Sequence, residues 1–563
     1  MKKIVIFSLV VLTAFMFSCS EEWLDTKPKA ANSINTFYSE TGVNALLTGA
    51  YSMLDGHYNN DWGFNQWGGS VTNWVWGSVA ADDAYKGSDP SDQQTINDIE
   101  QFNVSPSNEY CDSKWRFMYE GVSRCNEILK VTSAVTAEQV SADKKAWFEA
   151  QTKVLRAHYY FELTRVFGKV PYIDENTQAP ETVKNDKFLF AEIEADLKAA
   201  IPSLKTRETD KARITSWAAK AYLAKVYLFQ KKYAEAKPLL VDIITNGGFS
   251  LMPNYQDNYM IATQNNAESI LEVQYAVNDG TDGSLNGGWG DALNFPSAGP
   301  STCCGFFQAS RNFANAFKVV EATGLPDFTN WNAPGQEVGG VEYKGAVDPR
   351  LDHSIGRPGI PFLDWGIQPI NNSWVRDPSN GGPFLFKKSL YKASEKSKAT
   401  QTGWATGVNA NNFRFIRLAH VYLWAAECEV EAGNLDKARE YVNIIRNRAK
   451  ASAVVTMPDG SPAAKYKVEP YSSFANADEA RNAVRLEHRL EFGMEGGRFF
   501  DLVRWGIAAQ TMQNYLNTEA PRRSYLSGRT FKAGVNEVWP IPQNQIDLSK
   551  VNGTSSLTQN TGY

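Results

Sequence analysis

Tryptophans gather in two polar stretches of this chain, and their type and setting suit them to bind a ligand. The two groups, one after residue 56 and one between residues 247 and 410, comprise Trp62, Trp67, Trp74, Trp76, Trp289, Trp331, Trp365, Trp374 and Trp404. An indole can stack on the C–H face of a sugar ring, while Asp, Asn or Arg side chains bind the hydroxyl groups. Covering part of one indole contributes about 1–2 kcal/mol, and each added hydrogen bond contributes about 1 kcal/mol. Two or three such platforms would give micromolar to millimolar affinity.

Two of these tryptophans are the leading candidates for stacking on a ligand. Trp76 shortly precedes Asp82 and Asp83, whose carboxylates can accept hydrogen bonds from sugar hydroxyls. Trp289 lies between two glycines, which we expect to leave the indole uncovered. Neither residue fits a helical stripe of apolar side chains. For any single tryptophan, packing in the core is the competing and more common outcome.

Further candidates in the second stretch are Trp331, Trp365 and the adjacent pair Cys303-Cys304. The two cysteines follow a Gly-Pro-Ser-Thr loop in a chain with six cysteines overall. Exported proteins permit disulfides. A disulfide between neighbours would make a flat, rigid contact surface for a ligand. The sequence leaves open whether this bond forms.

Known catalytic and metal-binding patterns are missing from the sequence. There is no Gly-x-Ser-x-Gly, His-Glu-x-x-His or phosphate-binding Gly-x-x-x-x-Gly-Lys-Ser/Thr motif. No Cys-x-x-Cys pair or histidine cluster suggests a metal, and no cofactor is implied. A glycosidase needs two carboxylates at a set distance, and with 62 acidic residues the sequence alone leaves that possibility open. The net charge of −5 argues against nucleic acid as a partner.

The first residues have the features of an export signal. Lys2 and Lys3 precede a mostly apolar stretch over 4–17, which is too short to span a bilayer. A small residue before Cys19 is typical of a lipoprotein cleavage site, so we interpret 1–18 as a signal peptide and Cys19 as the lipid anchor. The alternative is an ordinary signal peptide with an incidental cysteine. No later stretch is long and apolar enough to cross a membrane, so lipid is the only expected membrane attachment.

Much of the remaining chain has helical periodicity with a repeat. Ala224 and Ala236 are 12 residues apart on successive predicted helices, and Ala426 and Ala438 repeat this spacing. Small residues at fixed spacing let paired helices approach closely, as in tetratricopeptide repeats. Further helices are expected at 113–131, 145–167, 187–204 and 478–495.

The segment 484–506 predicts a helix that stops on glycine and then resumes. Gly493 and the glycines after it interrupt the helix, as expected for residues at a helix end. Glu487 and Glu491 are expected to form ion pairs with arginines at neighbouring helical positions. The aromatic residues that follow are expected to be buried, which gives this segment a structural role.

Between the helical parts, residues 247–410 are rich in Gly, Pro, Asn and Asp. Long loops inside a compact protein commonly carry function. We therefore expect a mainly α fold, in which tetratricopeptide-like helix pairs form a scaffold and long loop-rich excursions form the ligand face. The expected organisation is one fold over 19–563, with scaffold at about 33–246 and 411–510, the loop-rich insert at 247–410 and a tail at 511–563.

Six blocks of the sequence, in order, resemble the SusD/RagB family of surface glycan-binding outer-membrane lipoproteins. They are Cys19–Pro28, Leu155–Pro171, Arg414–Glu427, Val484–Gly506, Trp539–Gln543 and Gln559–Tyr563. The resemblance runs over nearly the whole chain. One departure is His488, where the family usually has arginine.

This resemblance implies a non-enzymatic role in nutrient uptake. Such a protein binds an oligosaccharide or polysaccharide and delivers it to a SusC-like TonB-dependent transporter. It is held in the outer membrane by its lipid, facing the cell exterior. The alternatives are the same fold binding peptides, a helical scaffold without a small ligand, and a hydrolase.

Overall fold

The computed structural model describes residues 34–56, 66–281, 285–301, 303–400 and 407–563. The predicted signal peptide, the predicted lipid anchor Cys19, and the tryptophans Trp62 and Trp404 lie outside the described residues. None of the described helices has the length and apolar character needed to cross a membrane.

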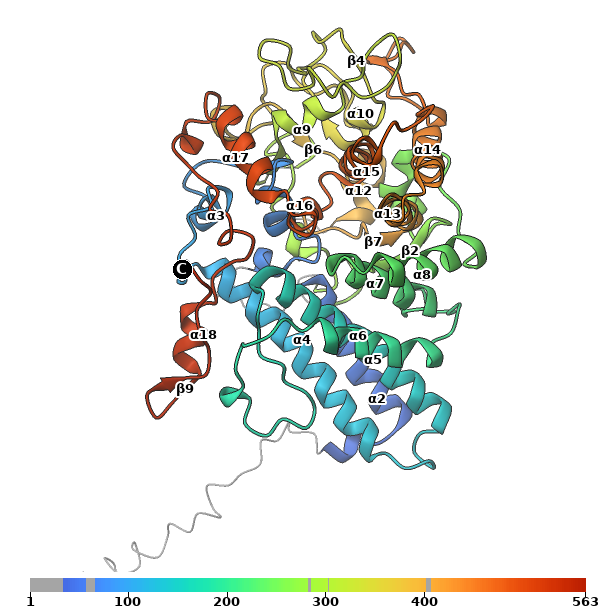
Figure 1. The fold of residues 1–563 in the computed structure, drawn as a ribbon, viewed down its shortest axis with the longest axis vertical. Coiled ribbons are helices and arrows are strands. Elements are labelled where there is room, and N and C mark those ends of the chain that lie inside the picture. The colour runs from blue at the N-terminus through green and yellow to red at the C-terminus, as the bar shows by residue number, and fades with distance from the viewer. Residues whose placement is uncertain (1–33, 57–65, 282–284, 302, 401–406) are drawn as a thin grey trace, which may run out of the picture.

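The N-terminal part is a layer of antiparallel helices that stack at the bottom of Figure 1. Its main helices are α2 (Glu40–Tyr51), α4 (Glu109–Ala134), α5 (Ala142–Phe167) and α6 (Phe190–Ala200), with a short α3 (Gln94–Glu100) before α4. The Asn108 side chain caps α4 by accepting a hydrogen bond from the Tyr110 amide. Successive helices pack against each other, α4 on α5 and α5 on α6.

Two helix pairs carry the predicted repeat. They are α7 (Ser216–Phe229) with α8 (Tyr233–Asn246), and α13 (Leu418–Glu431) with α14 (Leu435–Ala451). The four alanines at the 12-residue spacing, Ala224, Ala236, Ala426 and Ala438, are all fully buried. Since α8 also packs on α13, the two pairs form one continuous scaffold. The predicted mainly α fold class is confirmed.

The C-terminal part contains α15 (Ala477–Phe492), α16 (Arg498–Trp505), α17 (Ala508–Glu519) and α18 (Gln543–Leu548). The helix ends before Gly493 and resumes at Arg498, as predicted. Phe499, Phe500 and Trp505 are buried, which confirms their predicted structural role. α17 and α18 were not predicted from the sequence pattern.

The region 247–410 contains short elements joined by loops, at the top of Figure 1. Its helices are α9 (Arg311–Ala316), α10 (Arg350–Ser354), α11 (Pro378–Gly381) and α12 (Lys396–Ala399). The described strands are β1 (Ala84–Gly87), β2 (Ser269–Val273), β3 (Phe306–Ala309), β4 (Ala346–Val347), β5 (Ile355–Gly356), β6 (Leu385–Phe386), β7 (Phe413–Arg417), β8 (Lys465–Tyr466), β9 (Lys550–Val551) and β10 (Thr554–Ser555).

These strands form two-stranded sheets that attach the loops to the scaffold. β1 pairs antiparallel with β3, with Ala84 opposite Ala309, and β2 pairs antiparallel with β7, with Ser269 opposite Arg417. β5–β6 and β9–β10 are also antiparallel, whereas β4 and β8 are parallel. The β1–β3 pair brings the first tryptophan-rich stretch against the loop-rich region.

The ion pairs of α15 differ from the prediction. Glu491 binds Arg350, Arg417 and Arg448 from α10, β7 and α14, rather than an arginine on its own helix. Glu487 binds Arg350 as well. Both glutamates are buried, so their arginine partners come from the elements that cover them and fasten α15 to the rest of the fold.

Candidate ligand-binding site

The structure contradicts the expectation that the Trp76 indole is open to a ligand. Trp76 is 0% exposed and lies in a π-helical segment, Trp74–Val79. Its Nε1 donates to the Gly68 carbonyl at 2.8 Å, and its ring meets Trp539 edge-on at 5.6 Å between centroids. Trp76 is therefore a core side chain with its polar atom satisfied.

Trp289 is also covered. It begins a short 3₁₀ turn and is 4% exposed, in a small apolar cluster with Ala292 and Val408. This too contradicts the expectation of an uncovered indole.

The glycines beside these tryptophans have a different role from the one predicted. A Cβ atom at Gly77 would overlap the carbonyl oxygen of Gly496, and one at Gly290 would lie 2.6 Å from the side chain of Ser70. The missing side chains let two backbone segments approach closely. The glycines thus help to bury the tryptophans.

Asp82 and Asp83 are engaged in buried ion pairs and are not open to sugar hydroxyls. Arg498 donates to both carboxylate oxygens of Asp82, at 2.8 and 3.0 Å, and Arg489 lies 2.9 Å from Asp83. Burial by itself would raise the pKa of Asp82, but the charges of Arg489 and Arg498 lower it to about 2. For Asp83, burial dominates and raises the pKa. These residues join the β1 segment to α15 and α16.

Trp331 and Trp365 contact different residues. Trp331 is half-buried, and the guanidinium of Arg489 lies 5.9 Å from its ring centroid. Trp365 is half-buried elsewhere, where its Nε1 donates to the Tyr391 carbonyl at 2.9 Å. The Tyr391 ring in turn contacts Phe295 at 5.6 Å between centroids. Tyr391 therefore links Trp365 to Phe295, at the start of the loop that contains the adjacent cysteines.

Cys303 and Cys304 are joined by a disulfide in a loop that connects Phe295 to β3. Cys303 is half-buried and Cys304 is 6% exposed. The Ser301 hydroxyl donates to the Cys303 carbonyl at 2.9 Å and holds the turn before the disulfide. The bond that the sequence left open is therefore present.

A second loop lies against this one and carries Trp374 and Arg376. Both the amide and the hydroxyl of Ser297 donate to the Trp374 carbonyl, at 3.1 and 3.0 Å. Gly299 lies directly against the indole, at a position where a Cβ would overlap the ring. The Trp374 ring is half-buried and meets Phe362 edge-on at 5.9 Å. Gly299 has φ +79°, so both the nearby indole and the backbone conformation favour glycine at this position.

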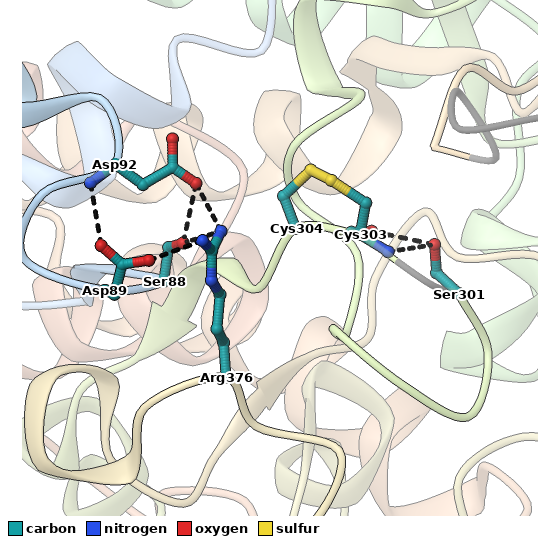
Figure 2. The surroundings of a disulfide bond; sticks show 7 residues. All are labelled: Ser88, Asp89, Asp92, Ser301, Cys303, Cys304 and Arg376. Carbon is teal, nitrogen blue, oxygen red and sulfur yellow. Dashed lines mark hydrogen bonds and ion pairs between the residues drawn. A yellow bond between two sulfur atoms is a disulfide. The ribbon is translucent and has the colours of Figure 1, made fainter.

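Arg376 connects these two loops to a third. Its guanidinium lies 2.6 Å from Asp89 and 2.5 Å from Asp92, and it donates to the Ser88 hydroxyl at 3.0 Å. Figure 2 shows this group beside the disulfide. The Arg376 side chain is 40% exposed, so the group is accessible to solvent. The Lys86 ammonium also stabilises this group by donating to the backbone carbonyls of Asp89 and Asp92.

We call the segments 88–92, 295–301, 303–305 and 361–376 the loop face. It combines two half-buried indoles, a disulfide, an accessible guanidinium and two partly exposed carboxylates. Indoles can stack on sugar rings, and the charged groups can exchange hydrogen bonds with hydroxyls. Within the described residues no group of three or more His, Cys, Asp or Glu is arranged to hold a metal ion.

Three clefts of about 370, 420 and 660 Å³ lie away from the loop face. The first is lined by the 206–215 loop and β2, and the other two lie between the 168–188 segment and the C-terminal arm. Of the tryptophans, only Trp115 lines one of them.

Three residues of the loop face were not predicted from the sequence: Arg376, Asp89 and Asp92. Arg376 follows Trp374 by two residues in a polar loop, and this local signal could have found it. The two aspartates carry no comparable signal, because only the fold brings them to Arg376.

Comparison with known proteins identifies the family. The SusD family pattern matches residues 267–563, and the pattern described as "Starch-binding associating with outer membrane" matches residues 22–228. The chain therefore belongs to the SusD family, as its sequence blocks predicted.

Individual relatives are similar over most of their length. A SusD-like protein of Bacteroides ovatus is 26% identical over 538 residues, covering 91% of this chain and 84% of the relative. The starch-binding protein SusD of Bacteroides thetaiotaomicron is 23% identical over 500 residues, covering 84% and 82%. A solved laminarin-binding SusD-like protein is 25% identical with a TM-score of 0.67, covering 93% of this chain and all (100%) of that one.

Proposed function

We propose that this protein binds an oligosaccharide or polysaccharide on its loop face, without catalysing a reaction on it. The observation that carries the proposal is the half-buried Trp374 in the same loop as the accessible Arg376, two residues away. Relatives named for binding starch and laminarin support a glycan as the ligand class.

The binding free energy expected of such a site is small. A sugar covering part of each indole contributes about 1–2 kcal/mol per ring, and net hydrogen bonds contribute about 1 kcal/mol each. Since association also costs free energy, micromolar to millimolar affinity is expected. The disulfide between Cys303 and Cys304 is a further candidate contact, through the half-buried Cys303.

We further propose that the protein is held in the outer membrane by lipid on Cys19, facing the cell exterior, and passes its ligand to a SusC-like TonB-dependent transporter. The sequence after residue 18 and the family pattern named for association with the outer membrane support this placement. No cofactor has a role in the proposed function.

The test is calorimetry on the protein without its signal peptide, against a panel of polysaccharides that includes starch and laminarin. Trp374→Ala should weaken binding of the best ligand by tenfold or more, which corresponds to about 1.4 kcal/mol. Trp147→Ala is the matched control, since Trp147 is half-buried on α5 away from the loop face. Equal affinities for both variants and the parent would place the site elsewhere.

The alternatives have distinct outcomes in the same experiments. Binding to a peptide library, with no response to any glycan, would favour a peptide-binding member of this fold. Release of shorter sugars from the best ligand would reveal a hydrolase. Absence of any ligand would leave a helical scaffold, although Trp374 and Trp365 on the loop face argue against that role.

A further inference from the structure

A small cavity of about 60 Å³ lies where five helices converge. It is formed by α5, α7, α13, α15 and α16, and so lies at the junction of the first helical layer and the C-terminal helices. Its charged and titratable lining consists mainly of Arg165, Lys225, His420, His488, Asp501 and Arg504. A water needs about 10–15 Å³ on this measure, so the cavity has room for a few waters or one small ion.

Two buried nitrogen atoms around the cavity lack a hydrogen-bond partner within the described residues. Arg165 Nε and His488 Nε2 are buried and have no hydrogen-bond acceptor or donor in the described residues. The described contacts of the Lys225 ammonium are with aromatic rings, the nearest being Phe415, 4.8 Å from Nζ to the ring centroid. Buried polar groups are nearly always satisfied, so two such atoms at one cavity, beside a half-buried lysine whose described contacts are aromatic rings, indicate a missing partner.

The local charges do not balance. Glu162 is shared by Lys114, at 2.9 Å, and Arg165. Next to them Arg504 binds two carboxylates, Asp501 at 2.7 Å and Glu427 at 2.6 Å. With Lys225, four cations therefore face three carboxylates, which leaves one positive charge uncompensated. Glu495 also lines the cavity, but it is bound to Lys388 and Arg417 on its other side.

We propose that this cavity binds one monovalent anion of about the size of chloride, held by Lys225 Nζ and Arg165 Nε. Such an ion supplies the single missing negative charge and accepts hydrogen bonds from both cations. The ion joins α5 to α7 at the place where these helices meet α15 and α16 around the cavity. It thereby acts as a structural ligand that stabilises the junction between the two parts of the scaffold.

Anion binding at this place should depend on pH. Burial and the charge of Arg165 lower the pKa of Lys225 to about 7. The other groups that face it are Glu162 from α5, Asp501 and Arg504 from α16, His420 from α13 and His488 from α15. A bound anion favours the charged lysine, so binding takes up a proton near neutral pH. Affinity should therefore fall as the pH rises from 6 to 8.

The experiment measures thermal unfolding of the protein without its signal peptide in sodium gluconate, with chloride or bromide added at constant ionic strength. A ligand that binds only the folded state raises the melting temperature with its concentration. We expect a saturating rise that is larger at pH 6 than at pH 8. Lys225→Met should weaken the apparent halide affinity by tenfold or more, about 1.4 kcal/mol.

Lys220→Met is the matched control, because Lys220 lies on the same helix but binds Asp242, 2.7 Å away, outside the cavity. It should keep the halide response. A crystal grown in sodium bromide should show an anomalous peak next to Lys225 in the parent protein, which decides the case even when Lys225→Met fails to fold. A melting temperature that is the same in gluconate and halide, or a cavity without the anomalous peak, would overturn the proposal.

Discussion

Arg498 and Asp82 form a two-point ion pair, in which Nε and Nη2 of the arginine donate to the two carboxylate oxygens at 2.8 and 3.0 Å. Arg498 is the first residue of α16, and Asp82 follows the buried Trp74–Val79 segment. The pair therefore connects α16 in the C-terminal part to the tryptophan-rich stretch in the N-terminal part. Because Asp82 is 2% exposed, its carboxylate has no room for a sugar, and its role is structural.

Replacing Asp82 should destabilise the protein without affecting the ligand site. Asp82→Ala leaves the mostly buried Arg498 without its counter-charge and leaves Arg489 with Asp83 alone, and breaking such a pair typically costs about 3–5 kcal/mol. Urea unfolding should detect this loss. Asp436→Ala is a suitable control, since the Asp436 side chain is 90% exposed and pairs with Arg439 on the same helix, so it should cost less than about 1 kcal/mol. Equal stabilities would contradict the structural role.

The same pair should also contribute to the pH dependence of stability. The folded protein holds the pKa of Asp82 at about 2, below its ordinary value of 3.8. A carboxyl group with a lowered folded pKa stabilises the protein above its unfolded pKa, and this stabilisation is lost as the pH falls toward the folded pKa. The difference in unfolding free energy between the parent and Asp82→Asn should therefore shrink between about pH 4 and pH 2. A constant difference would contradict the assignment.

Trp76→Ala should lower the stability of the protein. Removing a buried aromatic side chain costs about 3–5 kcal/mol, and here it also leaves the Gly68 carbonyl without its donor. Glycan affinity of the folded fraction should stay unchanged. Thermal unfolding and calorimetry on the same sample separate the two effects. A variant with the parent melting temperature but no glycan binding would restore Trp76 as a ligand contact.

The helical scaffold was predictable because its signals are local. The spacing of Ala224 and Ala236 and the glycine at position 493 each reflect contacts between neighbouring elements. The partners of Glu491 come from α10, β7 and α14, which no spacing within α15 can reveal.

The ligand site was harder to predict for the same reason. Whether an indole is covered depends on distant residues such as Trp539, which buries Trp76. A glycine beside a tryptophan is compatible both with an exposed indole and with a close contact between two backbone segments. At Gly77 the structure shows the close backbone contact. Trp365 and the two adjacent cysteines lie on the loop face, within the region 247–410 whose loop-rich composition predicted a ligand face.

The lipid anchor is a separate prediction. Cys19→Ala should yield a protein that no longer fractionates with membranes when the transporter is absent. Several acyl chains bind membranes firmly, at about 0.8 kcal/mol for each buried CH₂, whereas a protein without them has no comparable attachment. Ligand affinity should be unchanged, because the loop face is built from residues after position 87. Membrane fractionation of the variant equal to that of the parent would exclude lipid on Cys19.

The disulfide of the loop face should matter for binding more than for stability. A disulfide stabilises mainly by restricting the unfolded chain, and the restriction grows with the length of the closed loop. Since Cys303 and Cys304 are adjacent, the loop they close is minimal and the effect on unfolding should be small. Replacing both by serine should leave the melting temperature almost unchanged.

If the disulfide forms part of the contact surface, the same double variant should bind the glycan several-fold more weakly, because the apolar sulfur surface next to Arg376 is lost. Calorimetry beside thermal unfolding measures both quantities. Cys111→Ser serves as a control for cysteine replacement: that thiol is buried in α4 away from the loop face, so its loss should lower stability and leave affinity intact. Unchanged affinity in the double variant would confine the contact surface to the tryptophans and Arg376.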